Sequence, residues 1–376
     1  MTAWTDAVAA LWPDAEVRSG GGTPALREFA FLPSAERPRL LLPAGLPAAA
    51  ASALRRYSHD LGAPQRVVRA LTATGVRAGL ADRALRHRLH VTGAGESIED
   101  RLSELLSRRV VVSVGLGSAR ANRKPILHAI TPDGEPVAFV KVGDTATARE
   151  LVAAEAAALA RLAERSFSGL RVPRVLYHGD WRGLRLLVLS PLPTGAVSFR
   201  SRRRAPVAAM RELTGATRRV PLASTAFWRR FGDLPLEDTR QRERLAEVVE
   251  RIGAAYGADE LEFGAWHGDW APWNMAWHRG RVQLWDWERY DPDVPAGLDY
   301  AHYRLQTGGG YDTWPDSELL APYGMRGRAA AITVELYLLE LARRYLGDAQ
   351  GALGEPLRPR AAKLLDLLHS NAGRTA

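Results

Sequence analysis

The polar segment WHGDWAPWNM at residues 266–275 is the feature that most constrains what this chain can fold into. The apolar run VQLW at residues 282–285 follows it and ends at Asp286. Asp269, Asn274 and Asp286 are therefore five and then twelve residues apart. We expect the first two in a loop between helices and the third at the end of a strand, an arrangement in which the three side chains can converge on one point.

These residue types are the ones that phosphoryl transfer requires. A carboxylate can orient an attacking hydroxyl and accept its proton, and hard oxygen ligands can hold Mg²⁺ against nucleotide phosphates. Asn supplies a neutral carbonyl oxygen for such a cation, and Asp supplies a charged one. The alternative to a catalytic site is a chance His-Gly-Asp turn whose acidic side chains are solvated. A metal site at His267 and His278 is a weaker rival, because no HExxH-type spacing supports it.

Local patterns divide the chain into three sections. Residues 1–92 show strand patterns at 27–32 and 39–42 and helical patterns at 2–12, 48–57 and 64–74, and their role is unknown. Residues 93–193 begin with a helix capped by Ser97 and continue with strands at 109–114, 125–131, 137–142, 175–177 and 184–189. An alanine-rich helix is expected at 149–165. Residues 194–376 are expected to be mostly helical apart from 281–287.

The second section carries a candidate phosphate-binding pattern. Gly115, Gly117 and Ser118 lie between two predicted strands, where glycine lets the backbone approach phosphates closely. Such a turn is also common in plain hairpins. Lys141 lies within an apolar strand, where burying a lysine is costly, although it could also lie at an edge. The following helix offers Glu150 and Glu155 as partners for it.

Residues 266–286 resemble the catalytic loop and metal-binding strand of the aminoglycoside phosphotransferase family, whose relatives include choline kinase and other small-molecule kinases. That family has a His-Gly-Asp-x-x-x-x-Asn loop and a following Asp. The resemblance covers about residues 105–305. It implies an α+β, bilobal, protein-kinase-like fold: a small β-rich N-lobe at 93–193 and a helical C-lobe at 194–376. Residues 1–92 would be an extra N-terminal α/β section.

The resemblance also implies roles for individual residues. Asp269 would be the catalytic base, His267 a structural member of the catalytic loop, and Asn274 and Asp286 the Mg²⁺ ligands. The turn residues Gly115, Gly117 and Ser118 would bind the nucleotide, which is ATP or another nucleoside triphosphate. Lys141 would neutralise its phosphates and pair with a helix glutamate, and Glu155 matches the family's helix better than Glu150 does.

The implied reaction is phosphorylation of a small-molecule hydroxyl, on a sugar, an amino sugar or a similar natural product. A Ser/Thr peptide acceptor and a nucleotide-binding pseudoenzyme are the alternatives. Charge does not identify the acceptor, because an acidic cluster of side chains would favour a cationic acceptor and a basic cluster would favour an anionic one. Trp270 or Trp287 could stack on a sugar ring. The acidic cluster comprises Asp286, Glu288, Asp291, Asp293 and Asp299, and the basic cluster is the arginine-rich run at 200–219.

Composition and charge argue against several kinds of site and partner. The chain has no cysteine, which excludes disulfides and thiolate metal sites. Its net charge of +9 suits polyanions such as ATP, but the arginines are dispersed and no nucleic-acid module is present, which argues against nucleic acid. The most apolar stretch, 40–54, is interrupted by Pro43 and Pro47 and is too short to span a bilayer. The N-terminus does not resemble a signal peptide, so we expect a cytoplasmic protein.

Overall fold

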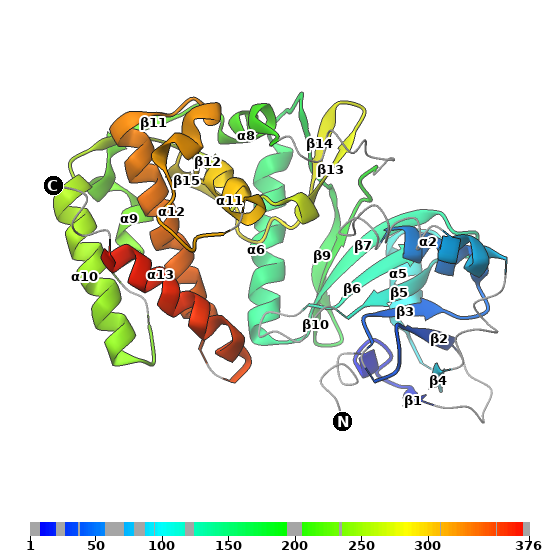
Figure 1. The fold of residues 1–376 in the computed structure, drawn as a ribbon. Coiled ribbons are helices and arrows are strands. Elements are labelled where there is room, and N and C mark those ends of the chain that lie inside the picture. Colours follow the sequence, from blue (N-terminus) through cyan, green and yellow to red (C-terminus); the bar gives the residue numbers. More distant parts are fainter. Residues whose placement is uncertain are drawn as a thin grey trace. The chain divides into compact units, whose positions relative to one another are not determined.

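The computed structural model describes the chain outside residues 1–7, 20–26, 37, 57–70, 79–86, 94, 117–123, 194–204, 233–234, 309, 351 and 371–376. The chain forms two compact units (Figure 1): Met1–Glu164 with Val172–Pro193, and Arg165–Arg171 with Thr194–Ala376. The first is built around a large sheet and the second is mainly helical, so the α+β class expected from the sequence is confirmed. The expected section boundaries at 92 and 193 stay predictions.

The first unit is organised by one nine-stranded sheet in the order β1-β4-β2-β3-β5-β6-β7-β10-β9. Neighbouring strands are antiparallel throughout. The sheet contains strands from both sides of residue 92. The strands are β1 (Glu16–Ser19), β2 (Arg27–Leu32), β3 (Leu40–Pro43), β4 (Arg88–Thr92), β5 (Val111–Gly115), β6 (Ile126–Ile130), β7 (Pro136–Gly143), β9 (Val175–Trp181) and β10 (Leu184–Leu189).

Strands β3 and β5, in the middle of this sheet, are buried on both faces. Successive side chains of a strand point to opposite faces. Leu40 and Leu42 accordingly join a core with helix α2 (Pro47–Arg56), while Leu41 joins a second core with helix α5 (Ile98–Leu105). The capping box of Ser97 with Asp100 begins α5, as expected from the sequence.

Strand β7 leads directly into helix α6 (Ala146–Ala163), whose N-cap is Thr145. Helix α6 packs on β7, β9 and β10, and its buried residues include Val152, Glu155 and Leu159. The segment 71–77 is helical, and the remainder of the helix expected at 64–74 lies outside the described residues, as does most of the one expected at 2–12.

The second unit contains more strands than expected. Besides β14 (Arg281–Leu284), it has β11 (Arg218–Pro221), β12 (Glu260–Trp266), β13 (Met275–His278) and β15 (Asp291–Pro295). They form two three-stranded sheets, β11-β12-β15 and β13-β14-β8, where β8 is Leu170–Arg171. The unit is mostly helical as expected, but β11, β12, β13 and β15 lie outside 281–287, the one segment for which the sequence indicated a strand. These strands are four to seven residues long, too short to show a clear alternation.

Helices form most of the second unit (Figure 1). In the described part of the chain no helix has the length and apolar character needed to cross a membrane. Short 3₁₀ turns occur at Leu222–Ser224, Pro272–Asn274, Ser317–Tyr323 and Ala352–Leu357. The α-helices are α8 (Val207–Thr214), α9 (Ala226–Arg229), α10 (Thr239–Tyr256), α11 (Leu298–Thr307), α12 (Gly327–Asp348) and α13 (Arg358–Ser370).

Candidate functional site

Strand β12 delivers the loop that carries the expected catalytic residues. The loop turns directly after Trp266, and the side chain of Asp299 on α11 accepts hydrogen bonds from the backbone N–H groups of His267 and Gly268, at 2.7 and 3.0 Å. Burial raises the pKa of the Asp299 carboxyl to about 7, against the effect of these two donors. Asp299 is thus a structural brace for the loop.

Gly268 lets the loop turn at this point. Its φ of +85° lies in the left-handed region, and a Cβ added there would lie 2.3 Å from the carbonyl oxygen of Arg289. The Gly268 carbonyl accepts a hydrogen bond from the Arg344 guanidinium, which also lies over the ring of Trp266. The turn is therefore fixed on both sides by contacts that leave no space for a side chain.

We expect Gly268→Ala to destabilise the protein more than Gly280→Ala does. Gly280 has a similar φ of +78° but nothing within 4 Å of its added Cβ, so it is a matched control for backbone strain. The control should lose about 1–2 kcal/mol, and Gly268→Ala a further ~1–3 kcal/mol from the overlap with Arg289. Urea unfolding of both variants measures the difference. Equal losses would show that the turn tolerates a side chain.

His267 connects the loop to the end of β14. Its Nδ1 accepts a hydrogen bond from the N–H of Asp269, at 3.2 Å, and its Nε2 lies 3.0 Å from the carbonyl oxygen of Trp285. The proton must therefore reside on Nε2, because a carbonyl can only accept. Burial lowers the pKa of His267 to about 4, which keeps the ring neutral. The fully buried ring of His267 thus connects the backbone of Asp269 to that of Trp285.

Asn274 is held against Asp269 through its amide nitrogen. Its Nδ2 donates to the backbone oxygen of Asp269 and to the Oδ2 of the same residue, both at 2.8 Å. With the nitrogen used in this way, the side-chain carbonyl oxygen Oδ1 is the atom of Asn274 that can bind a cation. Its backbone oxygen also accepts from the N–H of Trp285, which connects the loop to the second part of the motif.

Asp286 follows β14 in an unusual backbone conformation. Its φ is +73°, which non-glycine residues rarely adopt, and such strain persists mainly where the surrounding structure enforces it. The negative charge of Asp286 acts on both Asp269 and His267, so the three side chains are close enough to interact electrostatically. The structure thus brings Asp269, Asn274 and Asp286 into one region, as the spacing predicts.

The ionisation of Asp269 is set by opposing effects. Burial disfavours the charged carboxylate, but His302 outweighs this effect and holds the pKa of Asp269 below its usual value. The Nε2 of His302 lies 3.0 Å from the Oδ1 of Asp269. Sequence analysis missed His302, because a lone histidine in an amphipathic helix gives no local signal.

The first unit contains the expected lysine–glutamate pair. The Nζ of Lys141 on β7 lies 2.5 Å from the Oε2 of Glu155 on α6, and both side chains are buried. Glu150 is exposed, so Glu155 is the one that faces the strand. Gly115 ends β5, adjacent in the sheet to β6. Gly117 and Ser118 lie outside the described residues.

The acids expected on the acceptor side mostly have internal partners. Arg230 binds Asp291 at 2.8 Å, and Arg218 binds Asp293 at 3.0 Å. Asp299 is itself buried under the loop, where it accepts hydrogen bonds from the backbone of His267 and Gly268. Of the arginine-rich run, residues 200–204 lie outside the described residues. Arg211 donates to the backbone oxygen of Tyr323.

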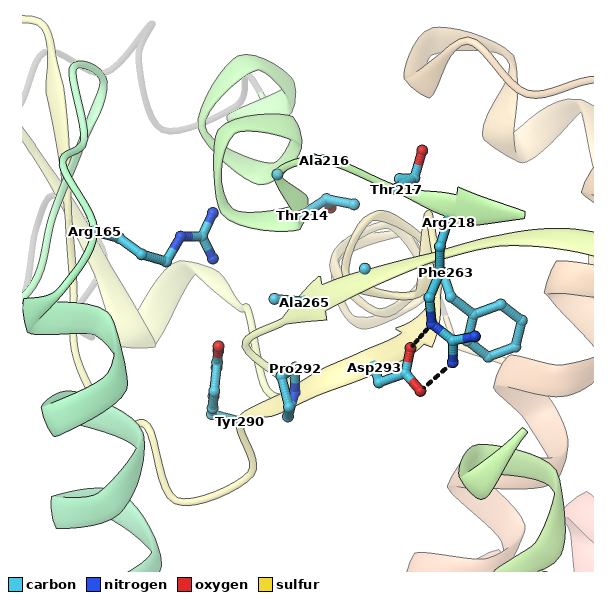
Figure 2. A pocket seen from close by; sticks show the side chains of 12 residues that line it. Arg165, Thr214, Ala216, Thr217, Arg218, Phe263, Ala265, Tyr290, Pro292 and Asp293 are labelled. Atoms are coloured by element: carbon cyan, nitrogen blue, oxygen red, sulfur yellow. Dashed lines mark hydrogen bonds and ion pairs between the residues drawn. The ribbon is translucent and has the colours of Figure 1, made fainter. Parts of the chain in front are cut away.

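A surface pocket of about 380 Å³ opens beside β12 in the second unit. Figure 2 shows Arg165 and Tyr290 extending toward it and the paired Arg218 and Asp293 lining its far side. Because the ion pair neutralises Asp293, the pocket does not present an acidic wall. It gives no support for a cationic ligand at this place.

The tryptophans of the motif separate into buried and exposed ones. Trp270 and Trp287 are 0% exposed, so the expectation that either could stack on a sugar ring is wrong. Both pack around the ring of His267. Trp273, between Asp269 and Asn274, is 42% exposed and is the aromatic of the loop that a ligand can reach. Sequence pattern could not separate these residues, because burial depends on the turn between them.

Comparisons with known proteins find similarity in structure but not in sequence. No family model matches the chain, and no curated protein matches it. A thermostable mutant of the aminoglycoside phosphotransferase APH(4)-Ia, in a ternary complex with ADP and hygromycin B, is 13% identical, with a TM-score of 0.50 over 75% of this chain and 99% of that one.

Two further solved structures are similar to a lower degree. The streptomycin–ATP–APH(2″)-IIa ternary complex is 12% identical, with a TM-score of 0.47 over 75% of this chain and 98% of that one. Amicoumacin kinase hAmiN, in complex with AMP-PNP, Ca²⁺ and Ami, is 12% identical, with a TM-score of 0.43 over 68% and 88%. The similarity to APH(4)-Ia supports the fold assignment. The chain has the protein-kinase-like fold of the aminoglycoside phosphotransferases.

Proposed function

We propose that this protein is an ATP- and Mg²⁺-dependent phosphotransferase that acts on a hydroxyl group of a small molecule. The observation that carries this proposal is the Asp269–Asn274 pair. Asn274 donates to one oxygen of the Asp269 carboxylate, His302 lies 3.0 Å from the other oxygen, and the partially exposed side chain of Asp269 remains accessible. A carboxylate kept ionised in this way suits the task of orienting a hydroxyl and accepting its proton.

The metal-binding part of the proposal rests on the chemistry of the donor atoms. Asn274 offers Oδ1, and Asp286 offers a carboxylate on a backbone held in a strained conformation. Neutral and charged oxygen atoms together form a donor set suitable for Mg²⁺. A bound Mg²⁺ would neutralise phosphate charge. Asn274 and Asp286 would hold the ion. His267 would connect the loop that carries Asn274 to the end of β14, which Asp286 follows.

The nucleotide-binding part rests on Lys141. A buried lysine needs a compensating charge, and Glu155 supplies one at 2.5 Å. The pair fixes the ammonium group on a central strand, since β7 is bordered by β6 and β10. We propose that Lys141 binds nucleotide phosphates and that Gly115, Gly117 and Ser118 supply backbone N–H groups to them.

The acceptor is proposed to be a small molecule with free hydroxyls, such as a sugar or an amino sugar. The structurally similar APH(4)-Ia was solved with hygromycin B, which supports a small-molecule acceptor. The exposed indole of Trp273, in the same loop as Asp269, offers an apolar face on which a sugar ring can stack.

Thermal unfolding with ATP and MgCl₂, followed by an ATP-consumption assay with a panel of hydroxyl compounds, tests the proposal. A nucleotide present at 100 times its dissociation constant stabilises the protein by about 2.7 kcal/mol, which raises the unfolding temperature measurably. Omitting MgCl₂ should reduce that shift. Lys141→Met should abolish it while Lys363→Met, on an exposed residue of α13, should not. Absence of any nucleotide-dependent shift in the wild-type protein would contradict the proposed function.

A further inference from the structure

His302 lies in the interior of the second unit, on α11 three residues after Asp299. Its side chain is 3% exposed, so it is almost fully desolvated. A buried histidine needs partners for both ring nitrogens, because each unsatisfied polar atom costs free energy in the interior. The partners of His302 are therefore informative about what it does.

One partner of His302 is Asp269 and the other is Tyr337. The Nδ1 atom lies 3.1 Å from the hydroxyl of Tyr337 on α12, and the Nε2 atom lies 3.0 Å from the Oδ1 of Asp269, within ion-pair distance but without the alignment of a hydrogen bond. A carboxylate can only accept, so the Nε2 atom that faces Asp269 must carry a proton. In the neutral ring, Nδ1 then accepts the hydroxyl proton of Tyr337.

Tyr337 is suited to act as a permanent donor. It is 1% exposed, and burial raises its pKa well above the ordinary value, so the hydroxyl keeps its proton at any working pH. Its ring also packs edge-on against that of His302, at 5.9 Å between centroids. Helix α12 therefore fixes both the position of the imidazole and the nitrogen that carries its proton.

The two oxygens of Asp269 are held by different segments. His302 contacts Oδ1, and Asn274 donates to Oδ2 at 2.8 Å. Two contacts on opposite oxygens fix the rotation of the carboxylate plane, which a single contact cannot do. Correct orientation of a reacting group contributes to the rate, and a small misplacement has a large effect.

We propose that His302 is a positioning residue for phosphoryl transfer, which holds the Asp269 carboxylate in one orientation and is itself fixed by Tyr337. This inference rests on the proposed function, since it assigns His302 a place in that reaction. It goes beyond the loop motif, because the supporting chain Tyr337–His302–Asp269 comes from helices α11 and α12. His302 does not touch substrate in this role.

The kinetic test compares His302→Leu with His302→Gln, using water as the acceptor and phosphate release from ATP as the readout. Leucine removes the donor, whereas the amide nitrogen of glutamine can occupy the place of Nε2. We expect His302→Leu to lower kcat by about 10- to 100-fold, with the KM for ATP within about twofold of wild type. His302→Gln should regain a substantial part of kcat. Equal kcat in wild type and His302→Leu would overturn the proposal, as would a glutamine variant no better than leucine.

A second measurement does not depend on turnover. ¹⁵N-histidine NMR of the full chain should show His302 as the Nε2–H tautomer, and Tyr337→Phe should change the Nδ1 resonance by removing its donor. A ring with the proton on Nδ1 would overturn the proposed arrangement even if the variants fold poorly. If wild type neither binds nor hydrolyses ATP, the proposed function fails; if it does both and only the His302 results differ from expectation, the positioning role fails.

Discussion

Asp269→Asn is expected to lower phosphoryl transfer by about 10²- to 10⁴-fold, the usual contribution of a general base. Asparagine has the same shape but cannot accept the acceptor's proton, so the loop should stay folded while the reaction slows. Nucleotide binding should persist, because the Lys141–Glu155 pair belongs to the other unit. Turnover is measured as ATP consumption and binding as the shift in unfolding temperature with ATP and MgCl₂.

The matched control for this experiment is Asp366→Asn. Asp366 is an exposed acid on α13 that pairs with Arg244, so the substitution removes the same charge far from the motif. Its turnover should stay within about twofold of wild type, since an exposed ion pair contributes little. Full turnover in Asp269→Asn would exclude Asp269 as the base, whereas loss in both variants would point to an effect of net charge.

Glu340→Gln is expected to cause the largest loss of stability. Glu340 on α12 is 2% exposed and accepts hydrogen bonds from Arg230, Arg343 and Arg344, at 3.0, 2.9 and 2.7 Å. Removing one member of a buried charge network leaves the others uncompensated and costs about 3–5 kcal/mol. Because Arg344 also donates to the Gly268 carbonyl, the catalytic loop should lose order in the same variant.

The pH dependence of stability checks the same cluster. Burial opposes the charge of Glu340, but the surrounding guanidinium groups outweigh it and lower its pKa to about 2 from 4.5. A lowered pKa in the folded state contributes stability above the unfolded value, and that contribution disappears as the pH falls from about 4.5 toward 2. Wild type should therefore lose stability over this range more steeply than Glu340→Gln does.

Glu318→Gln is the control for Glu340→Gln. Glu318 forms an exposed ion pair with Arg326 at 2.7 Å, and such pairs contribute about 0–1 kcal/mol. Urea unfolding at neutral pH should thus separate the two substitutions clearly. Similar stabilities of the two variants would mean that the guanidinium groups around Glu340 find other partners or water.

Local sequence signals predicted a large part of the first unit. Ser97 with its following acids predicts the start of α5, and the strands expected at 125–131 and 137–142 are present as the paired strands β6 and β7. The pairing of Lys141 with Glu155 also matches expectation. In each case the determining residues are close in sequence or follow a regular period, which is the information that a single sequence carries.

In the second unit, several features depend on contacts between residues far apart in the sequence, which local patterns do not predict. The sheet β11-β12-β15 joins three short strands far apart in the chain, so no local alternation marks it. His302 reaches Asp269 only because α11 packs beneath the loop, and the partners of Asp291 and Asp293 are arginines from other elements. Ion pairs with these arginines therefore account for two members of the acidic cluster, which was one of the two opposing charge signals in the sequence.

The nine-stranded sheet has a consequence for experiments on residues 1–92. Strand β3 pairs with β5, and one apolar core includes Phe29 and Leu89 together with Leu127 and Val140. Truncation at residue 92 would leave β5 as a bare edge with apolar side chains on both faces. Unprotected edges of this kind serve as templates for pairing with other chains, so the shortened protein should aggregate. Loss of activity on truncation would then report insolubility rather than loss of a recognition module.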